Sequence, residues 1–335
     1  MKNNLKKIFN FLLLLTIAVL VLYFSLKDDY NIIVDLILSM NKIWVIVAIL
    51  LVFSYYFFRA IVIKKLANKF NEKYSFKSSL RMVLETNFFH SITPFATGGQ
   101  PYEIYSLTKR NLKITEATNV SIQNFIVYQI AIVLLGILAL LYNYFFHIFS
   151  GSLLKNLVVI GFLINFIVIV ALFVLTFTKK INKVIIKFIL KLLHTLRIIK
   201  NEEDKEKEIN EYLKDFNEGA KLLLNDKFEF IINIFLELIS LCGLYLVPLA
   251  LLYATGDYTS FNSIEAIVTS AYVMLIGSFV PIPGGTGGLE YGFVTFYGTF
   301  LTSNLVKAIM LVWRVVTYYL GMLIGAIVLS IKKEG

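Results

Sequence analysis

The chain has 335 residues, of which 58% are hydrophobic and only 16% charged, and its formal net charge is +10. A soluble protein carries roughly 25% charged residues, and one globular core cannot bury this much apolar side chain. The composition therefore excludes a soluble enzyme and predicts an all-α, polytopic integral membrane protein. With one cysteine, Cys242, and three histidines without ligand spacing, we expect no disulfide within the chain, no metal site and no cofactor.

Six uninterrupted apolar segments follow one another, each long enough to cross about 30 Å of hydrocarbon as a helix. They cover residues 8–26, 43–63, 118–146, 157–178, 228–253 and 306–331. The first follows a basic amino terminus, as in a signal peptide, but it is longer than an h-region and lacks small residues for cleavage. We therefore expect it to remain as a span. Two further apolar regions, 78–109 and 264–301, are interrupted by proline and glycine, so that neither half could cross alone.

Lysine and arginine residues are concentrated in alternate loops. Seven lie from Arg59 to Arg81 and many more within 179–227, whereas segments 149–156 and 254–263 carry one between them. This bias predicts a protein of the cytoplasmic membrane with both termini in the cytoplasm. The insert 179–227 is expected to form a helix on the inner membrane surface and then a cytosolic helix. Because the basic residues flank membrane segments, they indicate contact with anionic lipid headgroups rather than with nucleic acid.

The two interrupted regions share a sequence pattern, "SITPFATGGQPYE" and "SFVPIPGGTGGLE". The alignment pairs Ser91 with Ser278, Pro94 with Pro281, Gly98 with Gly285 and Glu103 with Glu290. The first region begins and ends at cytoplasmic loops, and the second begins and ends outside. We therefore predict two re-entrant helical hairpins, 78–109 and 264–301, that enter from opposite faces. The single membrane domain 1–335 would then consist of two inverted repeats, 8–146 and 157–331.

Broken helices at membrane depth are tolerated only where they are buried in protein or line a wet cavity. Each break leaves the amino terminus of a second half-helix near the bilayer centre, where free N–H groups favour an anion such as a lipid phosphate. The predicted hinges are Pro94, Pro101, Pro281 and Pro283. The residues predicted to bind the substrate are Glu290, Arg314, Gly284, Gly285, Thr286, Gly287, Gly288, Thr97, Gly98, Gly99, Gln100 and Glu103.

The charged candidates each have two interpretations. Glu290 and Glu103 lie about three residues after a plausible helix start, where a carboxylate caps the helix. Alternatively, each is a membrane-embedded carboxylate that contacts a cationic headgroup, takes a proton or pairs with Arg314. Arg314 either contacts phosphate and Glu290 or extends to the outer surface, and Glu237 is a candidate for an internal ion pair. A nucleotide loop is excluded because no G-x4-G-K-[ST] motif is present.

The segments "TPFATGGQP", "PIPGGTGGLE" and "WRVVTYY" resemble the lysylphosphatidylglycerol synthase transmembrane family, a flippase-like membrane region, and the resemblance covers nearly the whole chain. The matching residues are Pro281, Pro283, Gly284, Gly285, Gly287, Gly288, Glu290, Trp313, Arg314, Pro94, Gly98, Gly99, Gln100 and Pro101. Glu103 departs from the pattern, since relatives often have an amide there. The resemblance is to a region of bacterial proteins and so implies a bacterial cytoplasmic membrane. The family's full-length members also carry an aminoacyltransferase domain that makes lysyl-phosphatidylglycerol.

This resemblance implies two alternative functions. In the first, the chain translocates an anionic, aminoacylated or polyprenyl-phosphate lipid between leaflets, by itself and without a catalytic residue. In the second, it is the membrane component of a phosphatidylglycerol lysyltransferase and acts with a separate aminoacyltransferase. A glycosyltransferase is a further partner to consider. The chain has no room for the transferase domain, so we expect it to lack that activity by itself.

Overall fold

The structure, a computed structural model, describes residues 30–149, 152–177, 218, 219, 221, 225–277 and 280–331, in which every regular element is helical. The longer helices are α2 (Tyr30–Ser39), α3 (Lys42–Asn68), α4 (Phe76–Ile92), α5 (Gly99–Thr108), α6 (Ile114–Phe146), α7 (Ser152–Phe177), α10 (Lys227–Tyr245), α11 (Val247–Ala254), α12 (Ser263–Gly277), α13 (Gly288–Tyr297), α14 (Ser303–Arg314) and α15 (Leu320–Ser330). Three short ones are η1 (Pro94–Ala96), η2 (Pro283–Gly285) and η3 (Val315–Tyr319).

Among these residues, five helical stretches are long and apolar enough to cross a membrane. They are 42–68, 114–146, 156–174, 227–254 and 303–330. The prediction of an all-α membrane protein is confirmed, and these stretches coincide with five of the six expected spans. The sixth, 8–26, lies outside the described residues, so the count of six stays a prediction. Most of the insert 179–227 also lies outside them.

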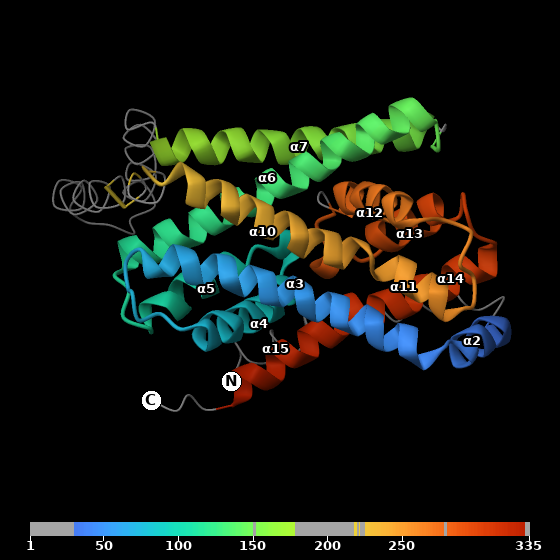
Figure 1. Ribbon diagram of the computed structural model, residues 1–335, viewed down its shortest axis with the longest axis horizontal. Helices are drawn as coiled ribbons and strands as arrows, with labels where there is room; N and C mark the ends of the chain where they lie inside the picture. Colours follow the sequence, from blue (N-terminus) through green and yellow to red (C-terminus); the bar gives the residue numbers. More distant parts are fainter. Residues whose placement is uncertain are drawn as a thin grey trace, which may run out of the picture.

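Helix α3 packs against α4, α6, α10 and α11. In Figure 1, α3, α6, α7 and α10 run along the long axis of the molecule, with α4 and α5 near one end and α12 and α13 near the other. The termini of several helices follow from local chemistry. Asn41 Oδ1 accepts the N–H of Ile43 at 2.9 Å and caps α3. Pro248, which has no N–H to donate, lies in the first turn of α11, directly after α10 ends.

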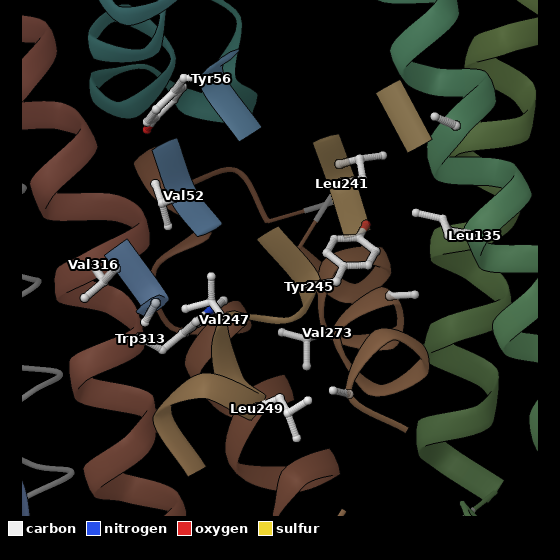
Figure 2. Close-up of a cluster of buried hydrophobic side chains, with 14 of the residues drawn as sticks. Val52, Tyr56, Leu135, Leu241, Tyr245, Val247, Leu249, Val273, Trp313 and Val316 are labelled. Atoms are coloured by element: carbon white, nitrogen blue, oxygen red, sulfur yellow. The ribbon is translucent and has the colours of Figure 1, made fainter. Parts of the chain in front are cut away.

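The core between the helices is apolar, and so is much of the outer surface. Figure 2 shows side chains from α3, α6, α10, α11, α12, α14 and η3 that meet in the interior, and all ten labelled ones are buried. Large apolar side chains also point outward, among them Leu138 on α6, Ile167 on α7 and Ile231 on α10, each about 60% exposed. A soluble protein would not expose an apolar surface of this kind, whereas hydrocarbon would cover it without cost.

The loops that carry basic residues lie together at one end of the bundle. Asn71 Nδ2 donates to the carbonyl of Arg110 at 3.3 Å, and Arg81 Nη2 donates to the carbonyls of Val328 and Ile331. The loops at the other end are also tied to one another, through the N–H of Asn41, which donates to the carbonyl of Ala254 at 2.7 Å. The bundle therefore has one basic end and one with few bases. Which end faces the cytoplasm stays a prediction.

Candidate substrate-binding site

The two interrupted regions fold as helical hairpins whose connecting loops meet. Helix α4 packs against α5, helix α12 packs against α13, and the loop residues of η1 contact those of η2. The hydroxyl of Tyr318 reaches from the last span to the first hairpin and donates to the carbonyl of Ser91 at 2.9 Å. Residues far apart in the sequence thus converge inside the bundle. That the hairpins enter the bilayer without crossing it stays a prediction.

Reciprocal packing relates the two halves of the chain. Within each half, the second helix of the hairpin packs against the span that follows, α5 against α6 and α13 against α14. Between the halves, the first helix of each hairpin packs against the other half, α4 against α15 and α12 against α6. Two related halves that exchange their hairpins would produce this pattern. Inversion of one half across the membrane is not tested by it and stays a prediction.

The first turns of the two connecting loops, Pro94–Ala96 and Pro283–Gly285, have the same local conformation, and the loops diverge after the threonine, where Gly98 has a φ of −76° and Gly287 a φ of 88°. Thr97 Oγ1 donates to the carbonyl of Pro94 at 3.0 Å, and Thr286 Oγ1 donates to the carbonyl of Pro283 at the same distance. These pairs belong to a shared sequence, P-x2-T-G-G, that runs from residue 94 to 99 and from 283 to 288. In each loop the two residues between proline and threonine have positive φ, between 52° and 66°.

This pairing corrects the sequence alignment by two residues. Pro94 corresponds to Pro283, which begins η2, rather than to Pro281. As a consequence, the counterpart of Glu290 is Pro101, and Glu103 has no acidic counterpart in the second hairpin. Pairing Pro94 with Pro281 also matches the two glutamates, and that identity favours it. The hydrogen bonds of the turn instead pair Pro94 with Pro283. Ser278, which the alignment paired with Ser91, lies outside the described residues.

Glu290 and Arg314 form a buried ion pair. Arg314 Nε donates to Glu290 Oε1 at 2.6 Å, and both residues are less than 10% exposed. The second carboxylate oxygen, Oε2, accepts the N–H of Gly287 at 2.7 Å and so caps α13. Arg314 also donates from Nη2 to the carbonyl of Gly284 at 2.9 Å. The helix cap and the ion pair, considered above as alternatives for Glu290, are both present.

Aromatic rings and a π-helical turn surround the arginine. Its Cζ lies 4.9 Å from the centroid of the Tyr318 ring and 5.7 Å from that of Trp313, within cation–π range. The helix directly after Arg314 widens into the π-turn η3. Such turns are rare and often occur at functional sites. Arg314 therefore does not extend to the outer surface, but is held in the interior by a carboxylate, a carbonyl and two rings.

The first hairpin presents its candidates differently. Thr97 is exposed, Gln100 is half-buried, and the N–H of Gly98 donates to Thr93 Oγ1 at 2.8 Å. Pro94 begins η1, and Pro101 lies in the first turn of α5, where a missing N–H costs nothing. Glu103 points away from the helix start. It accepts hydrogen bonds from Ser121 Oγ and Asn124 Nδ2, both on α6, at 3.2 and 3.0 Å, so it is not a cap.

Comparison with known proteins identifies the family. The sequence model of the lysylphosphatidylglycerol synthase TM region matches residues 10–325. The chain belongs to this family. A UPF0104 membrane protein of Archaeoglobus fulgidus is 27% identical over 329 residues, which cover 94% of each chain. The resemblance seen in the sequence motifs is thereby confirmed.

The match to the lysylphosphatidylglycerol synthase TM family includes Glu290, Arg314 and the residues around them, because it extends past both. Membership does not assign a role to any single residue, so substrate binding by these residues stays a prediction. The described geometry brings together Glu290, Arg314 and the second glycine loop, with the first loop in contact. It separates Glu103 from them, onto the interface between α5 and α6.

Sequence reasoning missed two charged residues in this member of the family. Arg59 counted among the loop bases, but it lies inside α3, and its side chain is 14% exposed. The signal was present, because four apolar residues separate it from Lys64. Glu85 on α4 was also missed. It pairs with Arg81 at 2.7 Å, an i, i+4 spacing visible in the sequence, and with Arg110 at 3.6 Å.

Proposed function

We propose that this protein translocates a phospholipid or a polyprenyl-phosphate-linked lipid between the two leaflets, and that the headgroup passes the pair Glu290–Arg314. The observation that supports it is a buried ion pair at the point where two glycine-rich loops meet, in a member of a lipid-related membrane family. A charge pair inside an apolar bundle is costly to maintain and usually marks a substrate or ion path.

The ion pair offers a route for an anionic headgroup. A phosphate presents oxygens that match the planar fork of an arginine, as a carboxylate does. A lipid phosphate can therefore replace Glu290 on Arg314, so that the guanidinium keeps a counter-charge throughout the exchange. Leaving a buried arginine unpaired would cost about 3–5 kcal/mol. Exchange of one anion for another avoids this cost and lowers the barrier to passage.

An aminoacylated phospholipid fits the same site with both of its charges. When phosphate occupies Arg314, the carboxylate of Glu290 is released and can accept an ammonium group. Gly287 keeps one of its oxygens in place through the helix cap. This favours a lysylated or otherwise aminoacylated lipid over a purely anionic one within the proposed substrate class.

Reconstitution in liposomes tests the proposal. Labelled anionic, lysylated and polyprenyl-phosphate lipids are supplied, and a membrane-impermeant quencher reports the outer leaflet. We expect transbilayer movement well above that of empty liposomes for at least one lipid class. Arg314→Lys keeps the charge but loses the planar fork, and should slow the movement at least tenfold. The double variant Glu290→Gln with Arg314→Gln should abolish it.

A matched control is Glu72→Gln, which removes an exposed carboxylate at the basic end and should leave the rate unchanged. Movement no faster than in empty liposomes for every lipid class would overturn the proposal. So would full activity of the folded double variant, because the protein would then act as a scaffold or by another path.

A second candidate function follows from the description of the family, which names a synthase. The chain would then be the membrane component of aminoacyl-phospholipid synthesis and act with a separate aminoacyltransferase. Lipid extraction after deletion of the gene separates the two. Loss of lysyl-phosphatidylglycerol from the total lipid supports the synthase component. An unchanged total with a changed distribution between leaflets supports the translocase.

A further inference from the structure

A second group of buried charges lies on helices other than those of the Glu290–Arg314 pair. It consists of Arg59 on α3, Glu103 on α5 and Glu237 on α10. Arg59 Nη1 is 3.5 Å from Glu237 Oε1, and the side chain of Glu237 is fully buried. Glu103 is 3% exposed and receives its two hydrogen bonds from the uncharged side chains of Ser121 and Asn124. The three residues connect helices from both halves of the chain.

The charges in this cluster do not balance. Arg59 pairs with Glu237 and lines a small cavity together with Glu103, so the three residues would carry one net negative charge if every group were ionised. Arg81 and Arg110 both pair with Glu85, and among the described contacts neither arginine reaches Glu103 or Glu237. An uncompensated charge inside an apolar bundle is strongly unfavourable and is normally removed by protonation or by a bound ion.

A small cavity adjoins the cluster. Its volume is about 30 Å³, and its lining includes Arg59, Glu103, His90, Thr86 and Asn124. Space of this size is enough for one or two water molecules, since one water needs about 10–15 Å³. The guanidinium of Arg59 faces the same space, which disfavours a metal cation there. The described residues hold no group of three His, Cys, Asp or Glu side chains that could bind one.

Several oxygens around the cluster lack a partner within the described residues. Thr86 Oγ1 and Asn124 Oδ1, whose residues line the cavity and are less than 10% exposed, make no hydrogen bond. Both carboxylate oxygens of Glu237 also accept none, although Arg59 is within ion-pair distance. Buried oxygens normally have a donor. Protonation of Glu237 would turn one of its carboxylate oxygens into a donor and remove its charge from the interior.

We propose that Glu103 and Glu237 together hold one exchangeable proton beside Arg59, which makes this cluster a proton-binding site. In the binding step, a hydronium ion in the cavity transfers its proton to a carboxylate oxygen. An O–H bond forms on the carboxyl group, one O–H bond of the hydronium breaks, and a neutral water remains. The site does not depend on the lipid translocation proposed above.

The other titratable groups around the pair have partners of their own or lie against the arginine. Tyr55 and Tyr56 on α3 and His90 on α4 line the cavity, and the phenol of Tyr128 on α6 lies against Arg59, 4.5 Å from Cζ to the ring centroid. The hydroxyl of Tyr55 accepts a hydrogen bond from Arg59 at 2.9 Å, and His90 Nδ1 is bound to the carbonyl of Ala96. The two carboxyl groups are therefore the ones that exchange the proton.

Infrared difference spectroscopy of the purified full chain tests this proposal, because a protonated carboxylic acid has a carbonyl stretch distinct from that of a carboxylate. We expect the wild type to show this band at neutral pH and to lose it at strongly alkaline pH. Glu103→Gln or Glu237→Gln leaves one carboxylate for Arg59, so either variant should lack the titrating band. Arg59→Gln removes the cation, so two protons should bind and the band should about double.

Glu72→Gln, which changes an exposed carboxylate, should retain the wild-type band. The two glutamates lie on different helices, so one folded variant of the pair is enough to decide. Absence of the band in the wild type at every pH would overturn the proposal. Persistence of an unchanged band in a folded Glu103→Gln or Glu237→Gln variant would do the same. Neither result depends on a transport assay, so a failure here differs from a failure of lipid translocation.

Discussion

The carboxylate of Glu290 makes two different contacts, one with each oxygen. One oxygen accepts the N–H of Gly287 at the start of α13, and the other pairs with the guanidinium of Arg314. Spacing in the sequence favours the cap, and burial in a span favours the ion pair, but a carboxylate has enough acceptor capacity for both. A single residue thus links the position of a half-helix to the charge state of the last span.

Replacing Glu290 should therefore separate the two roles. Glu290→Gln keeps an acceptor for Gly287 but leaves Arg314 buried without a counter-charge, at a cost of about 3–5 kcal/mol. We expect a clear fall in the melting temperature of the protein in detergent. The double variant Glu290→Gln with Arg314→Gln should recover part of that loss. Equal falls in the single and the double variant would show that the ion pair is not the stabilising element.

How far the residues could be predicted depends on where their partners lie. A pair between Arg314 and Glu290 is one of the alternatives that the sequence offers, because each is an isolated charge in an apolar segment and each needs a partner. For Glu103 the sequence leaves a helix cap and an embedded carboxylate open, and the structure shows no cap. Its partners on α6 are neutral and so leave no charge signal in the sequence. Arg59 was missed because a base near the end of a span looks like a loop base until the helix proves to continue to Asn68.

At the scale of elements, the two loops share their first turn but build it from different residues. The second loop has Gly284 and Gly285 at its positive-φ positions, and the first has Phe95 and Ala96. L-residues other than glycine are uncommon in this region, and each costs of the order of 1 kcal/mol there. The sequence contains the shared P-x2-T-G-G pattern, but an alignment that pairs the two glutamates matches as many residues and excludes it.

A matched pair of substitutions tests this equivalence. Gly285→Ala, at the counterpart of Ala96, places a Cβ 3.0 Å from the side chain of Leu289 at φ of 61°, so it should lower the melting temperature of the protein. Ala96→Gly relieves a left-handed alanine and should leave the melting temperature unchanged or raise it slightly. Thermal unfolding in detergent measures both. Similar behaviour of the two variants would mean that the loops are not held in the same way.

At the scale of the whole molecule, the spans were predictable because their length and apolarity are set by the bilayer. The break before α11 has a visible cause in Pro248, but the π-turn η3 has no marker in the sequence. The convergence of the two hairpin loops depends on packing between distant segments, which composition cannot reveal. Only the repeat of the glycine motifs indicated that they belong together.

The orientation inferred from basic loops leads to a labelling prediction. In a Cys242→Ser background, Glu72→Cys at the basic end should react with a membrane-impermeant maleimide only in opened cells. Ser263→Cys, at the start of α12 on the opposite end, should react in intact cells. Both positions are exposed, so access depends on the side of the membrane. Labelling of both from one side would contradict the predicted topology.

The π-turn after Arg314 also determines which way each part of the last span faces. Helix α14 packs against α2, α11 and α13, whereas α15, beyond the turn, packs against α4. An α-helix advances about 100° per residue, and one extra residue in a turn rotates everything beyond it by that angle. The π-turn thus changes the direction in which the side chains of α15 point relative to those of α14, although the two helices are continuous. If the same residues formed a regular α-helix, the side chains of α15 would be rotated by about 100° and the face that packs against α4 would turn away from it.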